Sequence, residues 1–599
     1  MNELLSRYCP RIDFESYEDF YANYRCTVPE NFNFARDVVD EWARIRPDKL
    51  ALLWTNDAGD MRSCTFADMK RLSDKAANAL RGLGIGKGDV VMLVLKQRLD
   101  VWVLMCALMK IGAVCIPGSY QLTQKDIEYR CAIAEVKLLI AVDDGDLVAN
   151  LRGARPRCGG VRHFALAGRF AAGGGAVSEA VPAGFVDMDA LIEEADERFT
   201  WFPGPLATRV ADPMLIYFSS GTTGMPKMVL HDHSLPLGHI VTAKYWQCVR
   251  EDKVHLTQTD SGWAKFAWGK IYGQWLCGAA VGVYDTEKFS PQGLLAALGR
   301  LRPATFCAPA TIFRFLIKED LSSYDFSFIE HTSVAGEPLS PEVYHQIKEK
   351  TGLEIREGFG QSETSVMAAA FKWLPVKPGS MGKPAPLFGL KLLDENGAEC
   401  DEGIVGNISV TAAGEPGTLG VDTLHAPGSP EDAAGTDRGG PTGASAFPGL
   451  FRGYWKDDGI TRDSWHDGAY YTGDMAWRDD EGYYWFVGRN DDVIKCSGYR
   501  IGPFEVESAL MEHPSVLECA VTAVPHPMRG QVVKATIVLA RGFSPSEELK
   551  KELQNHVKRV TAPYKYPRIV EFTAELPKTV SGKIQRNLIR KNDKMKFDK

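Results

Sequence analysis

The chain has 599 residues, too many for one ordinary domain, so two or more domains are expected. Its hydrophobic content of 45% and charged content of 24% are typical of a soluble globular protein. A net charge of -8 argues against nucleic-acid binding through a broad basic surface, although a local pocket can still bind a small anion.

The 13 cysteines are scattered singly, with no CxxC pair and no cysteine–histidine cluster at zinc spacing. This pattern indicates reduced thiols and predicts a cytoplasmic protein. Residues 1–21 carry acidic side chains and no apolar core, so they are unlike a secretory signal. The most apolar stretch, residues 101–118, is interrupted by Lys110, so we expect a buried helix followed by a strand and no membrane association.

Two segments are rich in Gly and other small residues, namely residues 152–185 and 412–449. Both are predicted to be loops or insertions. The second is dense in Gly, Pro and small polar residues, which makes it the better candidate for a disordered surface loop.

A stretch of Ser, Thr and Gly with one lysine, YFSSGTTGMPKMVLHDHS, spans residues 217–234. It differs from the common phosphate loop because Pro226 precedes Lys227 and β-prone residues, not a helix, follow. We therefore expect a loop between two strands, in which hydroxyls, backbone amides and Lys227 hold phosphate. The alternative is a mobile hairpin loop, since turn chemistry alone explains the Ser and Gly residues.

Residues 260–280, DSGWAKFAWGKIYGQWLCGAA, place Trp268, Tyr272 and Trp275 on one face of a predicted helix. Aromatic stripes of this kind usually pack into the core. Lys265, beside the stripe, is predicted to face water.

Residues 300–360 alternate between short strands and helices. Strands are predicted at 304–309, 331–338 and 353–360, with helices at 310–321 and 340–352. Short connections of this kind predict neighbouring parallel strands, whose carboxyl ends gather ligands. The ends at residues 335–338 and 357–364 are therefore expected to line one crevice.

The second of these ends contains EGFGQSETS, in which the carboxylate of Glu363 stands beside small residues. A carboxylate suits the preference of Mg²⁺ for oxygen ligands, so Glu363 is the predicted metal ligand. The alternative is a solvated turn, because charged loops at strand ends are common.

The chain changes character after residue 489, where a polar, turn-rich stretch predicts a boundary before a small α+β domain. Near that boundary, Asp474 could accept both hydroxyls of a ribose, and Arg489 and Arg500 could contact phosphate oxygens. Asp491 lies at the boundary itself. Lys583 stands in PKTVSGKIQR, and the alternative for this residue is an ordinary solvated lysine.

Five motifs, YFSSGTTGMPK, GFGQSET, YYTGDM, GRNDDVIKCSGYRIGPFEVE and PKTVSGKIQR, follow one another along the chain. Together they resemble the adenylate-forming superfamily, and DSGWAK, VAGEPLSPEV and TAPYKYPR most resemble its medium-chain acyl-CoA synthetases. The resemblance implies an α/β and α+β protein. Its large adenylation domain, residues 1–489, would contain βαβ subdomains and a β-barrel-like subdomain, and a small mobile α+β lid would span residues 490–599.

The resemblance also implies roles for individual residues. Residues 219–227 would close over the β- and γ-phosphates of ATP, Glu363 would hold Mg²⁺, and Lys583 would bridge the carboxylate and the α-phosphate. Lys583, Lys227 and Glu363 are thus the predicted catalytic residues. The predicted ATP- and AMP-binding residues are Ser219, Ser220, Gly221, Thr222, Thr223, Gly224, Lys227, Gly336, Glu337, Pro338, Glu357, Gly358, Phe359, Gly360, Gln361, Ser362, Asp474, Arg489, Arg500 and Lys583.

Asp491 resembles the hinge about which the small domain rotates before thioester formation. CoA would then be contacted by Gln121, Ser497, Gly498, Tyr499, Arg529, Lys558, Tyr566, Pro567 and Arg568. Trp263 and Trp268 would line the acyl pocket, where bulky indoles shorten the tunnel. One departure from the family pattern is Gln-Ser-Glu at residues 361–363, which replaces the commoner Gln-Thr-Glu and keeps the hydroxyl.

The implied activity is ATP-dependent ligation of a short- to medium-chain, branched or small aryl acid to CoA, with Mg²⁺ as cofactor. One alternative is an adenylation enzyme that loads a carrier protein, although only 16 residues follow Lys583 and none resembles a carrier domain. Another is a nucleotide-binding relative that has lost activity. The predicted partners are the acid, ATP and CoA, and the sequence is also compatible with a homo-oligomer.

Overall fold

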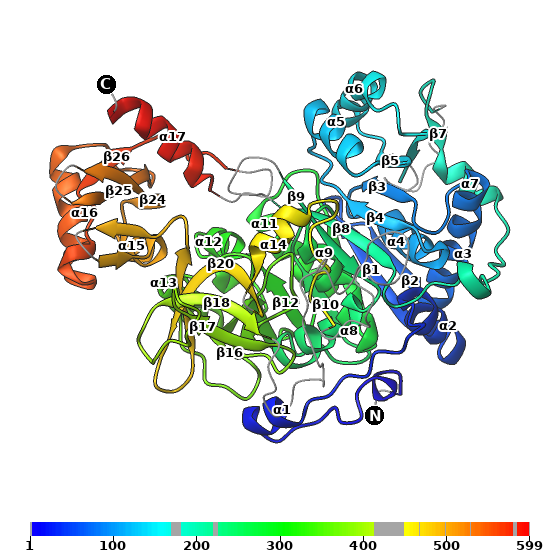
Figure 1. Ribbon diagram of the computed structural model, residues 1–599, viewed down its shortest axis with the longest axis horizontal. Helices are drawn as coiled ribbons and strands as arrows, with labels where there is room; N and C mark the ends of the chain where they lie inside the picture. The colour runs from blue at the N-terminus through cyan, green and yellow to red at the C-terminus, as the bar shows by residue number, and fades with distance from the viewer. Residues whose placement is uncertain are drawn as a thin grey trace.

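A computed structural model of the chain describes residues 3–168, 181–219, 226–411, 448–466, 468–496, 499–526, 529–578 and 584–597. In this part of the chain the strands form three sheets (Figure 1). The N-terminal elements are α1 (Tyr17–Asn23), η2 (Ala35–Asp40), α2 (Glu41–Ile45) and α3 (Phe66–Gly82).

The first sheet has the strand order β7-β6-β5-β3-β4-β8-β9. Its strands β3 (Val90–Val94), β4 (Val114–Pro117) and β5 (Leu138–Val142) are parallel and entirely buried, as expected for strands covered by helices on both faces. The other strands are β6 (His163–Ala167), β7 (Val186–Asp187), β8 (Pro213–Ser219) and β9 (Lys227–Asp232). The helices that connect strands of this sheet are α4 (Leu99–Ile111), α5 (Gln124–Ile133), α6 (Gly145–Ala154) and α7 (Met188–Glu194).

The apolar stretch at residues 101–118 is the buried helix α4 followed by strand β4, which confirms that prediction. The helix ends at Gly112, whose φ of 71° is the left-handed conformation that glycine adopts without strain. None of the helices in the described ranges is long and apolar enough to cross a membrane.

The second sheet contains the predicted run of parallel strands. Strands β12 (Thr305–Ala308), β13 (His331–Val334) and β14 (Ile355–Phe359) are parallel neighbours, and α12 (Ala310–Leu316) and α13 (Pro341–Thr351) connect them. The alternation predicted for residues 300–360 is therefore confirmed. The sheet continues through β10 (Val254–Thr257), β11 (Ala280–Asp285), β1 (Leu50–Asn56) and β2 (Met61–Thr65), with α11 (Pro291–Leu301) after β11.

The other end of this sheet is antiparallel. It contains β15 (Ala368–Ala369), β16 (Ser380–Pro384), β17 (Gly389–Leu393), β18 (Gly406–Thr411), β19 (Trp465–His466), β20 (Ala469–Arg478) and β21 (Tyr484–Arg489). These strands correspond to the expected barrel-like subdomain, but among the described residues they do not close into a barrel. Strand β16 pairs with both β21 and β15, so the strands continue the open sheet and do not return to their own first strand.

The third sheet is small and has its own hydrophobic core. It is formed by β22 (Ile494–Cys496), β23 (Tyr499–Ile501), β24 (Val516–His526), β25 (Gly530–Leu539) and β26 (Ile569–Phe572), with α15 (Pro503–Met511), α16 (Glu547–Val560) and α17 (Arg586–Phe597) around it. Figure 1 shows this unit in orange and red at one end of the molecule. A large N-terminal domain and a smaller C-terminal domain are thus present, and the boundary after residue 489 stays a prediction.

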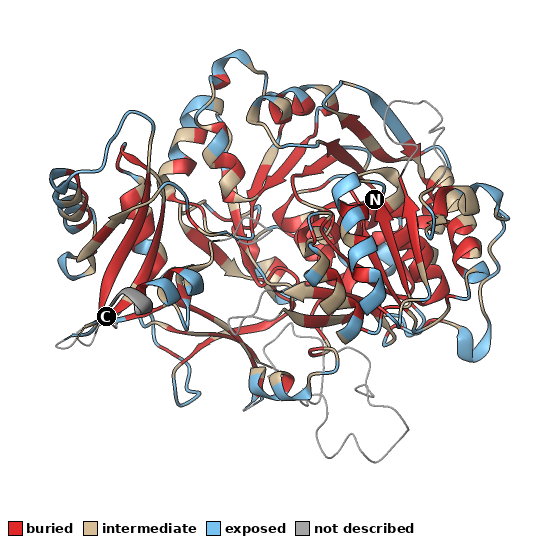
Figure 2. Ribbon diagram, turned by 90° about the horizontal axis from the view of Figure 1, so that it is seen from above, coloured by how far each residue is buried: buried red, intermediate tan, exposed pale blue. Residues whose placement is uncertain are grey.

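The main core joins the first two sheets. Its buried residues come from both, for example Val91 of β3, Val283 of β11 and Ile408 of β18. Figure 2 shows the buried strands in red and the exposed helix surfaces in pale blue. Further helices connect strands along the chain, namely α8 (Leu235–Ile240) and η6 (Val241–Trp246) after β9, α9 (Ala264–Lys270) and α10 (Tyr272–Leu276) after β10, and α14 (Asp458–Ser464) before β19.

One expectation about these helices is wrong. Trp268, Tyr272 and Trp275 do not share one helical face, because the helix breaks at Ile271, where φ is −138° and ψ is −72°. Tyr272 and Trp275 are fully buried in the core, whereas Trp268 is partly exposed and lines a cavity.

Candidate active site

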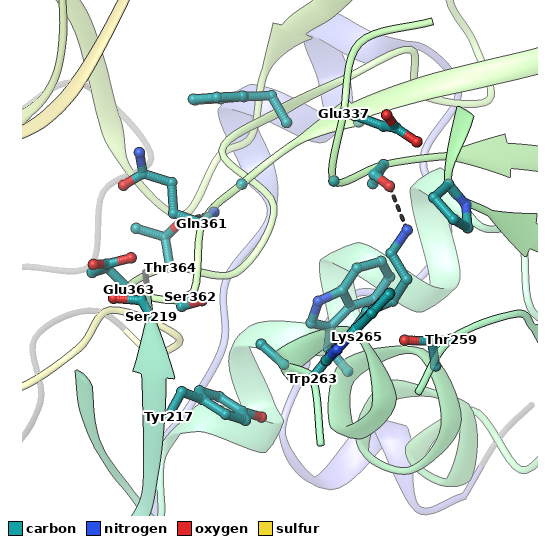
Figure 3. Close-up of a pocket in the computed structure, with 18 of the residues that line it drawn as sticks. Tyr217, Ser219, Thr259, Trp263, Lys265, Glu337, Gln361, Ser362, Glu363 and Thr364 are labelled. Atoms are coloured by element: carbon teal, nitrogen blue, oxygen red, sulfur yellow. Dashed lines mark hydrogen bonds between the residues drawn. The ribbon is translucent and has the colours of Figure 1, made fainter. Parts of the chain in front are cut away.

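A cavity of about 1360 Å³ lies where the carboxyl ends of strands from both large sheets meet. Figure 3 shows Ser219, Ser362 and Glu363 on one side of it and Thr259, Trp263 and Lys265 on the other. Most of the predicted ATP-binding residues that the structure describes line this cavity. They are Ser219, Lys227, Gly336, Glu337, Pro338, Glu357, Gly358, Phe359, Gly360, Gln361, Ser362, Asp474 and Arg489. Glu363, the predicted metal ligand, lines the cavity as well.

Lys227 and Ser219 belong to a hairpin. Strands β8 and β9 are antiparallel, and Ser219 pairs with Lys227 at the end of the ladder. The two strands predicted to flank the loop are therefore confirmed, and the strand that follows the loop supplies no helix dipole for an anion. Ser220, Gly221, Thr222, Thr223 and Gly224 lie outside the described residues.

The loop after β13 carries Gly336 and Glu337. Gly336 has φ of 97°, a conformation that a residue with a Cβ rarely adopts. One oxygen of Glu337 accepts the backbone N–H of Thr311 at 2.6 Å, and the other pairs with Arg314 at 2.7 Å. Burial alone would raise the pKa of Glu337, but Arg314 and Thr311 lower it below its usual value. Glu337 thus remains ionised, and its partners hold this loop against α12.

The second strand end is joined to β20 by side-chain hydrogen bonds. Gln361 Nε2 donates to Asp474 Oδ2 at 2.6 Å, and Tyr470 donates to Gln361 Oε1 at 2.9 Å. Asp474 pairs with Arg489 of β21 in the ladder, and its carboxylate lies 3.5 Å from the Arg489 Nε. A carboxylate, a carboxamide and a guanidinium are thus placed together at one wall of the cavity.

The hairpin and this strand end are also connected. The Nε2 of His231, in β9, lies 2.7 Å from the carbonyl oxygen of Ser362 and must donate to it. Burial lowers the pKa of His231 to about 4, so the ring is neutral at physiological pH. This bond fixes residue 362 beside the strand that carries Lys227.

Glu363 is 9% exposed and lines the cavity. Tyr454 donates a hydrogen bond to its Oε1 at 2.9 Å. Carboxylate oxygens are hard ligands, so the carboxylate of Glu363 suits Mg²⁺ better than a softer metal.

The predicted acyl-pocket residues Trp263 and Trp268 both line the cavity. The rings of Trp246 and Trp268 lie 6.0 Å apart, and His239 of α8 lies beside them. Lys265 was expected to face water, and this is wrong. It is 8% exposed, it donates a hydrogen bond to the carbonyl of Ala335, and its Nζ lies 5.8 Å from the Trp268 ring. The turn after β13 covers it, which the local sequence does not reveal.

Glu357 is buried at the end of β14, where the backbone N–H of Leu339 is its hydrogen-bond donor at 3.3 Å. Burial raises the pKa of this carboxyl to about 8. An unfolded glutamate loses its proton near pH 4.3. Between about pH 4 and pH 8 the folded protein therefore holds a proton that the unfolded chain has released, and stability falls as pH rises through this window.

Substitution Glu357→Gln is expected to remove this contribution. The difference in unfolding free energy between variant and wild type should shift in favour of the variant by up to about 1.4 kcal/mol for each pH unit between pH 5 and 8. Thermal unfolding of both proteins at pH 5.5 and 7.5 measures it. The same difference in Tm at both pH values would contradict a raised pKa.

The predicted CoA-binding residues are spread over two regions. Gln121 lines the cavity. Lys558, Tyr566 and Arg568 form a cluster on the small domain, where the Lys558 Nζ lies 4.2 Å from the Tyr566 ring and Arg568 donates to the Tyr566 hydroxyl at 2.8 Å. Pro567 lies within this turn, and Arg529 immediately precedes β25. None of these small-domain residues lines the cavity.

Asp491 lies two residues after the end of β21, between the second and third sheets, and its carbonyl accepts a hydrogen bond from Arg590 of α17 at 3.2 Å. Tyr499 and Arg500 lie in β23, but their side chains are outside the described part of the chain. Ser497, Gly498 and Lys583 are outside the described residues altogether. Lys578 and Ile584, on either side of residues 579–583, pair as an isolated bridge.

Three contributors to the site were missed from the sequence, namely Tyr454, His231 and Arg314. Each reaches its partner across a long stretch of chain, for example 131 residues between His231 and Ser362. The one local signal was the aromatic run FRGYW, residues 451–455, which follows the Gly- and Pro-rich segment.

Residues 39–414 match the family model described as AMP-binding enzyme, and residues 505–583 match the AMP-binding enzyme C-terminal domain. Acyl-coenzyme A synthetase ACSM3, mitochondrial, of Mus musculus is 39% identical over 97% of this chain and 94% of its own length. Acyl-coenzyme A synthetase ACSM5, mitochondrial, of Homo sapiens is 40% identical over 95% and 92%.

Among solved structures, the anthranilate CoA ligase AuaEII in complex with anthranoyl-AMP superposes with a TM-score of 0.81 at 25% identity, covering 96% of this chain and 99% of that one. The acyl-CoA synthetase of Brucella canis superposes with a TM-score of 0.69 at 28% identity, covering 98% and 100%.

The predicted cytoplasmic location is wrong. The acyl-coenzyme A synthetases ACSM3 and ACSM5, to which this chain is similar, are named as mitochondrial proteins, which contradicts the prediction. Reduced cysteines argue against an oxidising compartment, but they do not distinguish one reducing compartment from another.

Proposed function

Because the chain belongs to the AMP-binding enzyme family, we propose that it is an ATP-dependent acyl-CoA synthetase. The observation that carries this proposal is one cavity in which Lys227, the 335–338 and 357–363 strand ends and Asp474 converge beside a pocket lined by indoles. Such a cavity can hold a nucleotide and an acyl chain in contact.

The need for ATP follows from the low reactivity of a carboxylate as an electrophile. A carboxylate reacts poorly with a thiol because its leaving group would be oxide. Attack of the carboxylate oxygen on the α-phosphorus of ATP breaks the bond to pyrophosphate and gives an acyl-AMP, whose leaving group is AMP. The CoA thiolate then attacks the acyl carbon, the thioester forms and AMP departs.

In the first step, Lys227 and the backbone of the β8–β9 loop would hold the departing pyrophosphate, and Lys583 would offset the charge on the α-phosphate. Asp474 would accept the ribose hydroxyls, with Gln361 and Arg489 fixing its carboxylate. Rotation about Asp491 would then exchange Lys583 for the CoA-binding residues, so that one cleft serves both steps.

Mg²⁺ fits this site through the carboxylate of Glu363, which lines the cavity and keeps one oxygen unbonded among the described residues. When bound, the ion would neutralise charge on the phosphates. Mg²⁺ usually takes one or two protein carboxylates together with substrate phosphates, so a single glutamate is adequate.

The preferred acids are proposed to be short- to medium-chain, branched or small aryl acids, because Trp246, Trp263 and Trp268 limit the depth of the pocket. In a pyrophosphate-release assay with straight-chain acids from C2 to C16, we expect the highest kcat/KM in the short to medium range. Fastest turnover of C14 to C16 acids would overturn this substrate class. AMP formation that a holo-carrier protein accelerates and CoA does not would favour carrier loading.

Substitution Trp268→Ala is expected to raise kcat/KM for C10–C12 acids relative to C6 by about tenfold or more, since each accommodated methylene contributes about 1–3 kcal/mol in a hydrophobic pocket. Trp477→Ala is a matched control, because that indole stacks on Trp485 and does not line the cavity. The same chain-length profile in Trp268→Ala and wild type would exclude Trp268 from the acyl pocket.

A further inference from the structure

We propose that Tyr454 is a positioning residue for the phosphate-binding part of the site, where its hydroxyl orients Glu363 and its ring holds Lys227 apart from that carboxylate. The inference rests on the proposed function, because it assigns Glu363 to the metal and Lys227 to the phosphates of ATP. Tyr454 would touch neither ligand; it would act through these two residues.

The hydroxyl of Tyr454 is directed at the carboxylate. It donates to Glu363 Oε1 at 2.9 Å, and the two residues are 6% and 9% exposed. A hydrogen bond to an ionised acceptor is about twice as strong as a neutral one, and such a bond fixes the orientation of a metal-binding carboxylate.

The ring of Tyr454 meets the lysine. The Lys227 Nζ lies 4.8 Å from the ring centroid, within the range of a cation–π interaction. Lys227 and Glu363 carry opposite charges and line the same cavity, yet no ion pair joins these two described residues, and each contacts Tyr454 instead. A direct pair would have to be broken before either group could bind ATP, and the intervening ring prevents it.

The backbone places Tyr454 between the two. On one side, Tyr454 forms an isolated β-bridge with Val229 of β9. Next to this bridge, the backbone N–H of Leu230 donates to the carbonyl of Gly453, and that of Trp455 donates to the carbonyl of Met228. On the other side, Phe451 donates its backbone N–H to the carbonyl of Glu363 at 2.8 Å. Residues 449–455 thus connect the strand that begins at Lys227 to the turn that carries Glu363.

Two substitutions separate the two contacts. Tyr454→Phe removes the hydroxyl and keeps the ring, whereas Tyr454→Leu removes both. Tyr483→Phe is the control, because Tyr483 is also buried and donates one hydrogen bond, to the carbonyl of Pro375, but does not line the cavity. Calorimetric titration without acid, first with ATP and Mg²⁺ and then with ATP and EDTA, measures binding independently of turnover.

For Tyr454→Phe, the affinity for ATP with Mg²⁺ is expected to fall by about tenfold or more, while the affinity for ATP with EDTA stays within about twofold of wild type. For Tyr454→Leu, both affinities are expected to fall, that for ATP with EDTA by about threefold to tenfold. Tyr483→Phe is expected to bind like wild type in both titrations.

Equal affinities of wild type and Tyr454→Phe in both titrations would overturn the inference, and so would an equal loss in both. If Tyr454→Leu does not fold, Tyr454→Phe alone decides. A wild-type protein that binds no ATP would overturn the proposed function itself. If the wild type binds ATP with Mg²⁺ and Tyr454→Phe binds it with the same affinity, only the inference is overturned.

Discussion

Substitution Lys583→Ala is expected to lower the rate of acyl-AMP formation by about a thousandfold and to leave thioester formation from supplied acyl-AMP within about threefold of wild type. The lysine would stabilise charge that develops on the α-phosphate in the first step, and losing one such preorganised group costs about 10²- to 10³-fold in rate. In the second step the small domain would have rotated the lysine out of the cleft. ATP–pyrophosphate exchange measures the first half-reaction, and chromatography of the acyl-CoA formed from synthetic acyl-AMP measures the second.

The matched control for this experiment is Lys578→Ala. Lys578 lies five residues earlier, is largely exposed and pairs with Glu518 at 2.7 Å, so its loss should leave both half-reactions unchanged. If Lys583→Ala slows both half-reactions equally, the two-conformation account of the small domain is contradicted. If it slows neither, Lys583 is an ordinary solvated lysine.

Substitution Glu363→Gln is expected to lower kcat/KM for acyl-AMP formation by about a hundredfold or more. The amide has nearly the same size and can still accept the hydrogen bond from Tyr454, but it has no charge with which to hold Mg²⁺. Metal-ion catalysis of this kind contributes several kcal/mol to transition-state stabilisation, and each 1.36 kcal/mol is tenfold in rate. Initial rates of pyrophosphate release over a range of Mg²⁺ concentrations measure the effect.

Glu251→Gln serves as the control, because Glu251 pairs with Arg46 and lies outside the cavity. Thermal unfolding of both variants shows whether they keep the wild-type fold. A Glu363→Gln variant with the rate and the Mg²⁺ dependence of wild type would exclude Glu363 as the metal ligand.

Much of the site could be predicted because most of its functional residues stand in short, contiguous sequence motifs. A strand that ends in Ala-Gly-Glu-Pro or in Gly-Phe-Gly-Gln-Ser-Glu places those residues at the edge of a parallel sheet, wherever that sheet lies in the protein. The alternating strands and helices of residues 300–360 likewise follow from residue types alone. The structure gathers these strand ends around a single cavity, together with Lys227 and Asp474.

Other features depend on neighbours that are distant in the chain. From its own segment alone, Lys265 would be assigned to the surface. The turn after β13, 70 residues later, covers it instead and supplies the carbonyl that accepts its hydrogen bond. The aromatic stripe at residues 268–275 has a helical period, but the helix is interrupted at Ile271, whose backbone angles are not helical. The strands expected to close a barrel remain an open sheet, because β16 has partners on both sides.

The residues alone establish the class of the protein, the order of its motifs and the residue types that would bind ATP, since each of these resides in a contiguous stretch of chain. Only the tertiary structure places Tyr454 between Lys227 and Glu363, His231 on Ser362, and Gln361 on Asp474. These contacts join segments more than 90 residues apart. They form only when the packing of two sheets brings the strand ends together. A local sequence pattern does not predict that packing.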